Sequence, residues 1–351
     1  MPHDPAAHSP AEPASPLLVE VTRGPIAESL HRGVAAIADA SGKLLGTWGD
    51  VGRPVYPRSA IKSLQAIPLV ESGAADAFGL GDEELALACA SHGGELAHTE
   101  RVSAWLERIG CSAADLECGS HAPTCAPAAA ALVRAGTEPT PLHNNCSGKH
   151  TGFLTTARHL GEPTEGYRLF EHPVQQRVLG ALEQMTGQEL GAAPRGLDGC
   201  SIPTIAIPVE ALAFAMARLA DPRDLPDRRI DAVLRLRRAW GGQPFYVAGS
   251  GRFDTVLMEA TGGRVLVKTG AEGVYCACLP ELGLGIALKI DDGALRAAQV
   301  AVAALLREVG ALDDAAWKAL EPRINPPIET RRGFDAGAVR PAASFPADDP
   351  R

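Results

Sequence analysis

A serine and a lysine three residues apart, Ser59 and Lys62, have types and spacing that could support nucleophilic chemistry. They lie in the run 56–70, where apolar residues recur at helical intervals, and this pattern predicts a helix that begins near Pro57. The i, i+3 spacing places both side chains on one face of that helix. A neutral lysine can take the hydroxyl proton of a neighbouring serine and make its oxygen nucleophilic. Taken alone, however, so short a motif is more often an exposed pair on an amphipathic helix.

A second lysine strengthens the case for catalysis. Lys268 begins the sequence Lys-Thr-Gly at 268–270, at the end of an apolar, β-branched run. S-x-x-K followed by K-T-G on a strand is the motif pair of serine β-lactamases and penicillin-binding proteins. The two motifs occur here in the same order. Together they favour an active-site serine in a cleft whose opposite wall carries the positive charge of Lys268.

Hydrophobic periodicity predicts the elements that must position these residues. Strands are expected before and after a mostly helical insertion at about 82–240. We therefore expect an α+β fold of the serine β-lactamase and glutaminase type, with an antiparallel sheet and a helical subdomain. A single catalytic domain would span 17–336, between an N-terminal tail at 1–16 and a C-terminal tail at 337–351. The strands expected after the insertion lie at 255–259, 264–268, 274–279 and 285–290, and a helix follows at 294–309.

Three polar loops interrupt the helical segment, at 91–94, 144–150 and 198–201. Loops on a rigid helical frame often carry functional residues. Cys146 and Cys200 occupy two of these loops, and zinc favours thiolate and nitrogen ligands. Spacing alone nevertheless favours structural or incidental cysteines over metal ligands. The sequence Ser-Gly-Lys at 147–149 departs from the Ser-Asp-Asn of β-lactamases, so β-lactam chemistry is an analogy here.

Composition excludes several classes of protein. The chain of 351 residues has a net charge of −9, 46% hydrophobic residues and 21% charged residues. It has no basic excess for nucleic acid, and its apolar runs are too short to span a membrane. The N-terminal 16 residues lack the basic start and apolar centre of a signal peptide, so we expect a cytoplasmic protein. The eight cysteines are then expected to be thiols or metal ligands before disulfides.

Several longer motifs, taken in order, give a more specific indication. The chain resembles the rhizobial-type L-asparaginases, the inducible asparaginase II-like family, from about residue 17 to 336. The motifs that carry the resemblance are PRSAIKS at 57–63, ASHGG at 90–94, NNCSGKH at 144–150, LDGCSIP at 197–203, GRFDT at 251–255 and KTGAEG at 268–273.

The resemblance implies hydrolysis of L-asparagine to L-aspartate and ammonia by a homodimer with a serine β-lactamase-like fold. It also implies a zinc ion near the substrate, although the chemistry need not depend strictly on it. The roles carried over from the family comprise two serine–lysine pairs, Ser59 with Lys62 and Ser91 with Lys268; the zinc ligands Cys146, Lys149 and Cys200; and the substrate-orienting or neighbouring groups Arg58, His150 and Asp198.

The mechanism predicted on this basis begins with attack by Ser59 on the side-chain amide, with neutral Lys62 as the base; the sequence leaves Ser91 open as the alternative nucleophile. Ammonia leaves from a β-aspartyl ester, which water then cleaves, while Ser91 and Lys268 relay the leaving-group proton. Zinc would orient the substrate, because a serine needs no metal-activated water to cleave an amide. Three alternatives stay open: a glutaminase or other short amidase, a zinc-binding protein with a degenerate serine hydrolase site, and a penicillin-recognising acyl-enzyme.

Overall fold

A single large antiparallel sheet organises the computed structural model, which describes residues 14–346. Its strands follow the order β11-β12-β1-β2-β10-β9-β8, and β3 pairs with β2. The sheet therefore joins strands from both ends of the described chain. The strand bounds are β1 Leu17–Arg23, β2 Ile26–Asp39, β3 Leu44–Trp48, β8 Leu266–Thr269, β9 Val274–Leu279, β10 Leu284–Ile290, β11 Pro327–Glu329 and β12 Asp335–Pro341.

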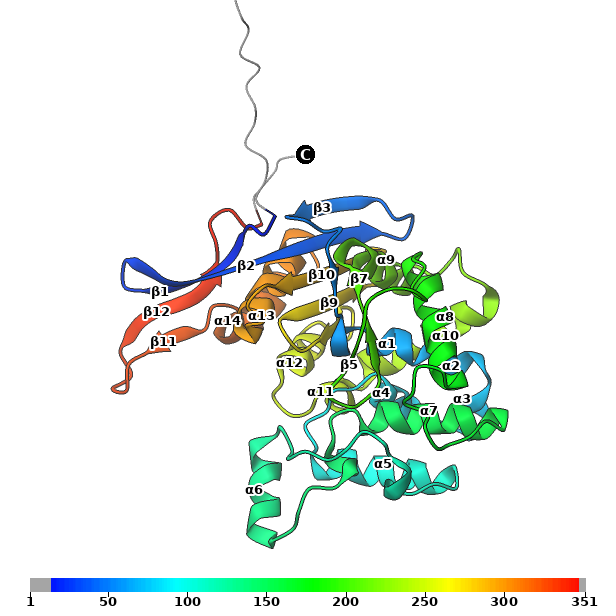
Figure 1. Ribbon diagram of the computed structural model, residues 1–351. Coiled ribbons are helices and arrows are strands. Elements are labelled where there is room, and N and C mark those ends of the chain that lie inside the picture. The colour runs from blue at the N-terminus through cyan, green and yellow to red at the C-terminus, as the bar shows by residue number, and fades with distance from the viewer. Residues whose placement is uncertain (1–13, 347–351) are drawn as a thin grey trace, which may run out of the picture.

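The long strand β2 belongs to two parts of the sheet. Its first half pairs with β1, and its second half pairs with β10 and β3. Gly33 marks the change, since a Cβ atom there would collide with the backbone oxygen of Lys289. Burial changes at the same point, because most of 26–32 is exposed whereas 34–38 is fully buried. The part formed by β1, β11, β12 and the start of β2 consequently projects from the body (Figure 1).

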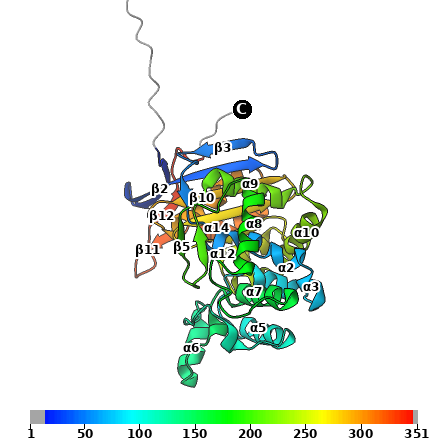
Figure 2. The same ribbon diagram turned by 45° about the vertical axis from the view of Figure 1, so that its right-hand side comes forward.

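Helices pack on the sheet and continue into a helical part that lies below it in Figures 1 and 2. Helix α9 contacts β2, β9 and β10, while α13 contacts β1, β9, β10 and β12. The first helices are α1 Lys62–Gln65, α2 Ile67–Glu71, α3 Ala74–Ala77, α4 Asp82–Ala88, α5 Leu96–Arg108, α6 Ala126–Ala135 and α7 Ser147–Leu160. The later ones are α8 Pro173–Thr186, α9 Val209–Ala220, α10 Asp227–Gly242, α11 Pro244–Ala248, α12 Phe253–Ala260, α13 Leu295–Glu308 and α14 Asp314–Ile324.

Short elements connect these layers. Two strand pairs lie apart from the main sheet and are both antiparallel. The short elements are the 3₁₀ helices η1 Arg58–Ile61, η2 Ala113–Asp115 and η3 Pro141–His143, and the strand pairs β4 Pro54–Val55 with β7 Ile207–Pro208 and β5 Arg195–Leu197 with β6 Pro203–Ile205. No helix among residues 14–346 is long and apolar enough to cross a membrane.

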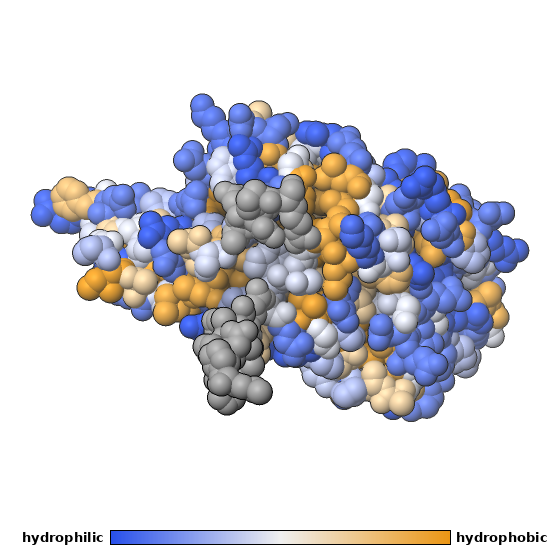
Figure 3. All heavy atoms as spheres, turned by 90° about the horizontal axis from the view of Figure 1, so that it is seen from above, coloured by the Kyte–Doolittle hydropathy of each residue, from blue (hydrophilic) through white to orange (hydrophobic). Residues whose placement is uncertain are grey.

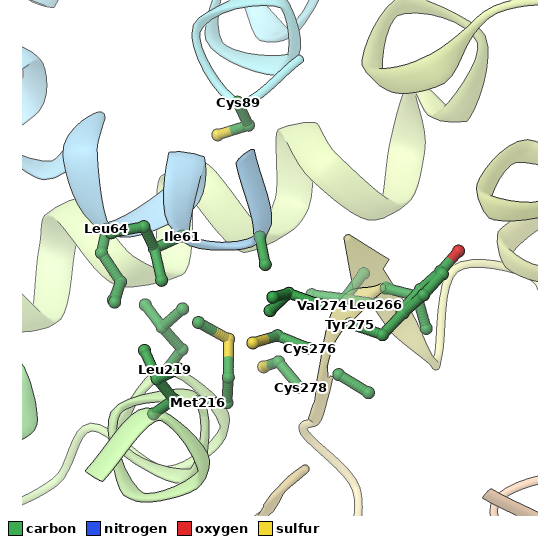
Figure 4. Close-up of a cluster of buried hydrophobic side chains, with 14 of the residues drawn as sticks. Ile61, Leu64, Cys89, Met216, Leu219, Leu266, Val274, Tyr275, Cys276 and Cys278 are labelled. Atoms are coloured by element: carbon green, nitrogen blue, oxygen red, sulfur yellow. The ribbon is translucent and has the colours of Figure 1, made fainter. Parts of the chain in front are cut away.

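The core fixes η1 and α1 against the sheet. Ile61 and Leu64 point toward Met216 of α9 and toward Cys276 of β9, and all four side chains are almost completely buried (Figure 4). Burying apolar side chains of this size contributes about 1.5 to 3 kcal/mol each. The segment that carries Ser59 and Lys62 is thus held firmly over the strands that carry Lys268. Polar residues cover much of the face seen from above, which also shows an apolar strip (Figure 3).

The predicted α+β fold with an antiparallel sheet and a helical part is confirmed, with several local corrections. The strand predicted at 255–259 is part of helix α12, because a short apolar run does not by itself distinguish a strand from a buried helix. The second part of the loop predicted at 144–150 is helical, because residues 147–150 form the first turn of α7 Ser147–Leu160. The helix predicted from Pro57 is divided into η1, α1 and α2.

The predicted tails also differ from the structure. Residues 335–341 form β12 and pair with β1, so the C-terminal tail predicted at 337–351 is wrong for its first five residues. The backbone oxygens of Ala14 and Pro16 accept hydrogen bonds from Asp50 and Gly33, so the end of the predicted N-terminal tail is bound to the body. The remaining predicted tail residues, except 342–346, lie outside the described part of the chain.

Candidate active site

A tight 3₁₀ turn positions Ser59 and Lys62 in the site. Ser59 lies in η1 and is half-buried, whereas Lys62 begins α1 and is completely buried. Within residues 14–346 no hydrogen bond joins the hydroxyl of Ser59 to either of the predicted lysines. The amine of Lys62 instead has three acceptors, which match the three donors of an ammonium group: the backbone oxygen of Ala90, the hydroxyl of Ser91 at 3.0 Å and the sulfur of Cys146 at 3.0 Å.

Ser91 lies between the two lysines. It follows α4, and its backbone N–H donates to the carbonyl of Val247 at 2.9 Å, which fixes its place. Its hydroxyl is 3.0 Å from the amine of Lys62 and 2.9 Å from the amine of Lys268. The predicted Ser91–Lys268 pair is therefore present as a hydrogen bond. Lys62, Ser91 and Lys268 together form one continuous buried chain.

Burial lowers the pKa of Lys268 from 10.5 to about 7, and the positive charge of Lys62 acts in the same direction. Desolvation has this effect because it disfavours the charged ammonium form. A neutral amine has a lone pair that can accept the hydroxyl proton of Ser91. The second hydrogen bond of Lys268, to the carbonyl of Thr269 at 2.9 Å, uses one of its remaining donors.

The predicted metal ligands Cys146, Lys149 and Cys200 also meet. Cys146 precedes α7, Lys149 lies in its first turn, and Cys200 lies between β5 and β6. The amine of Lys149 is 3.1 Å from the sulfur of Cys200. The two thiols share a hydrogen bond, which lowers the pKa of Cys146 well below its ordinary value and raises that of Cys200. Burial opposes the charged form of Lys149, but the adjacent sulfurs and Asp198 raise its pKa overall.

Two thiols and an amine are a donor set that suits zinc. Among the described residues no group of three His, Cys, Asp or Glu side chains could hold a metal, so a site here requires Lys149 as a ligand. Metal binding would have to displace the protons of Lys149 and Cys200, since only the deprotonated forms are ligands. Cys146, Lys149 and Cys200 therefore have suitable donor atoms and lie close together, so they fit the predicted zinc ion.

The three groups predicted to orient the substrate take different positions. Arg58 and Asp198 form an ion pair at 2.9 Å, with 25% and 13% of their side chains exposed. Burial raises the pKa of Asp198, but Lys149 and Arg58 together lower it overall. His150 is fully buried and hydrogen-bonds through Nδ1 to the hydroxyl of Tyr167 at 2.7 Å. Its Nε2 atom is buried and finds no hydrogen-bond partner within the described part of the chain.

Asp254 is a positioning residue. It belongs to the motif GRFDT at 251–255, but no role was predicted for it from the sequence. It is buried in α12, and it accepts hydrogen bonds from the backbone N–H of Thr269 at 3.1 Å and from the hydroxyl of Tyr275. Asp254 thereby ties β8 and β9 at the level of Lys268. Its negative charge also raises the pKa of Lys268, against the larger effect of burial. The presence of a carboxylate in the family motif that precedes Lys268 was the only sequence feature that pointed to this role.

Among solved structures the chain is similar to a β-lactamase from Mycobacterium bovis, with 16% identity, a TM-score of 0.42, and coverage of 79% of this chain and 94% of that chain. It is also similar to the D-alanine carboxypeptidase AmpC from Burkholderia cenocepacia, with 14% identity, a TM-score of 0.41, and coverage of 80% and 93%. No curated protein matches the sequence.

The family comparison covers nearly the whole chain. The model of the L-asparaginase II family matches residues 19–341, which include both lysines, both serines and the thiol cluster. The resemblance predicted from the motifs is thereby confirmed. The chain belongs to the L-asparaginase II family.

Proposed function

We propose that the protein hydrolyses the side-chain amide of L-asparagine to L-aspartate and ammonia through a serine ester. The observation that carries the proposal is the buried chain of Lys62, Ser91 and Lys268, which ends at an amine with a pKa of about 7. An amine with that pKa can both accept and release a proton near neutral pH, as general acid–base catalysis requires. Membership of the L-asparaginase II family supports an amide of asparagine as the substrate.

In the proposed first step, Ser59 attacks the amide carbon. Lys268 takes the hydroxyl proton of Ser91, Ser91 takes a proton from Lys62, and the freed lone pair of Lys62 takes the proton of Ser59. The ester then forms as the carbon–nitrogen bond breaks, and the same chain returns a proton to the leaving ammonia. The hydroxyl of Ser59 must turn to Lys62 when substrate binds, because catalytic hydrogen bonds often form only in the complex.

The proposed zinc would supply a Lewis acid that holds the substrate near Ser59, with Cys146, Lys149 and Cys200 as ligands. The sulfur of Cys146 is also 3.0 Å from the amine of Lys62. The thiol cluster therefore positions the first member of the proton chain. The family resemblance further predicts a homodimer, which light scattering would check. The cytoplasmic location expected from the N-terminal sequence would be checked by cell fractionation.

The central experiment is the release of ammonia from asparagine by wild type, Ser59→Ala and Ser91→Ala, each checked for folding by circular dichroism. We expect Ser59→Ala to lose at least 1,000-fold in kcat, since it lacks the nucleophile, and Ser91→Ala to lose about 100-fold, since proton transfer is interrupted. Activity of Ser59→Ala within tenfold of wild type would reject Ser59 as the nucleophile. A mass increase on Ser91 in acid-quenched samples would assign the ester to that residue instead.

The same assay separates the alternatives. Faster release of ammonia from glutamine than from asparagine would identify a glutaminase. One methylene changes binding by only about 1 to 3 kcal/mol, so this choice depends on measurement. Zinc in a protein that releases ammonia from no amide would favour a zinc-binding protein with a degenerate site.

A further inference from the structure

A charged hollow of about 430 Å³ lies directly beside the segment that carries Ser59. Binding pockets for small molecules usually have volumes of about 300 to 1,000 Å³, so this hollow is large enough for an amino acid. None of the proton-chain or thiol residues lines it. Its wall is formed by Arg53, Pro54, Val55, Tyr56, Arg58, Glu272, Lys289 and Asp291.

Sheet register places this hollow on the same face as the proposed proton acceptor. Lys268 on β8 lies opposite Cys276 on β9, and Lys289 on β10 lies opposite Val274 on β9. Cys276 and Val274 are two residues apart, so their side chains point to the same side of the sheet. The side chains of Lys268 and Lys289 share that side. Strand spacing and rise place their Cα atoms about 12 Å apart.

Two of the charged residues that line the hollow form no salt bridge with any of residues 14–346. Arg53 pairs with Asp291 at 2.6 Å, and Arg58 pairs with Asp198. The amine of Lys289, in contrast, donates only to backbone carbonyls, those of Glu272 at 2.7 Å and Ile290. Within the described residues neither Lys289 nor the carboxylate of Glu272 forms a salt bridge. Of the five charged residues that line the hollow, one cation and one anion are therefore left without a salt bridge, and they match the two charges of an α-amino acid.

Backbone strain is concentrated in the same wall. Among residues 14–346, three residues other than glycine have a positive φ, and two of them, Arg58 at 50° and Glu272 at 60°, line the hollow. Glu272 lies in the tight connection between β8 and β9, where its left-handed conformation suits Gly or Asn much better than Glu. Strained residues often cluster at functional sites. The strained conformation keeps a carboxylate in the wall of the hollow.

We propose that this hollow is the subsite for the charged head of the substrate, with Lys289 contacting its α-carboxylate and Glu272 its α-ammonium. The proposal rests on the function proposed above and assigns the two residues that would contact the α-carboxylate and the α-ammonium of asparagine. The side-chain amide would then extend past Arg58 toward Ser59. The product aspartate has the same head and should bind in the same subsite.

The test uses Lys289→Met and Glu272→Asn in the full chain, with Lys318→Met as the control at an exposed lysine outside the hollow. We expect both variants to raise the KM for asparagine about tenfold or more with kcat within about threefold, because each loses a charge-assisted contact with the head group. Aspartate binding measured by calorimetry should weaken about tenfold in both. Glu272→Asn should leave the melting temperature unchanged or higher, since Asn tolerates the positive φ.

Succinamate, which lacks the α-ammonium group, separates the two contacts. We expect Glu272→Asn to raise the KM for asparagine but not the KM for succinamate. Lys289→Met should raise both KM values. Unchanged KM values in both variants would overturn the subsite while leaving the amidase intact, even if aspartate binding fell. If wild type hydrolyses no amide, the proposed function fails. Calorimetry with aspartate then still tests the subsite, because unchanged aspartate affinity in both variants would refute the subsite.

Discussion

Replacing the buried amine of Lys268 by an apolar side chain should change stability in a strongly pH-dependent way. A pKa lowered from 10.5 to about 7 corresponds to about 5 kcal/mol of cost for keeping the ammonium form buried. The unfolded chain binds more protons than the folded chain between these pKa values, so stability rises with pH in that window. The cost is fully present below about pH 7 and disappears as pH approaches 10.5.

The variant Lys268→Met removes this cost together with the hydrogen bonds to Ser91 and Thr269, which contribute about 1 to 3 kcal/mol in total. We therefore expect Lys268→Met to be more stable than wild type by about 2 kcal/mol or more at pH 6. Near pH 10 the order should reverse, since wild type then keeps its hydrogen bonds at little cost. Urea unfolding at pH 6, 8 and 10 measures both differences.

Lys318→Met is the matched control, because Lys318 is exposed and its removal should have little effect at any pH. In the same experiment, kcat/KM of wild type should rise as pH increases through about 7, as Lys268 becomes neutral. Lys268→Met should lose at least 100-fold in kcat. A stability difference between wild type and Lys268→Met that does not change with pH would refute the buried neutral amine.

Three further predictions follow from the site. Asp254→Asn removes a charge that raises the pKa of Lys268, so the acidic limb of the activity profile should move to lower pH, which initial rates across pH 5–9 would show. Gly270→Ala places a Cβ atom about 2.7 Å from the backbone oxygen of Pro57, so we expect a loss of about 1 to 3 kcal/mol in urea unfolding. Cys146→Ser and Cys200→Ser should each lower zinc affinity at least 10-fold in a competition titration with a chromophoric chelator, and unchanged affinity would reject the proposed ligands.

The sequence predicted the fold class because strand and helix periodicities are strong in long segments. It was less successful where short segments depend on tertiary contacts. Helix α7 contains Gly148 and Gly152, which weaken a helical pattern, yet every residue from 147 to 157 is buried. At Gly148 a Cβ atom would collide with the carbonyl of Leu87, so glycine permits α7 to pack closely on α4. Such packing has no signature in local periodicity.

The family motifs predicted the convergence of the site residues and the Ser91–Lys268 pair, but not the partners of Lys62. The motifs singled out Lys62, Ser91, Lys268 and the thiols, and the structure brings these groups together. Sequence spacing could not show that Lys62 bonds to Ser91 and Cys146 while Ser59 bonds to neither lysine. These hydrogen-bond partners depend on the 3₁₀ turn of η1 and on the path of the chain after α4. The charged pair Lys289 and Glu272 likewise becomes visible only through sheet register.

Helix α6 differs from the other long helices because none of its side chains is buried, and it stands apart from the body in Figures 1 and 2. Tertiary packing normally provides most of the stability of a helix in a protein, and ten residues alone form a marginal helix in water. The amide hydrogens of 126–135 should therefore exchange with deuterated solvent within seconds through local opening. Those of β9 should exchange only through global unfolding. A protease that needs an extended substrate would make its first cut in this helix without disturbing the sheet.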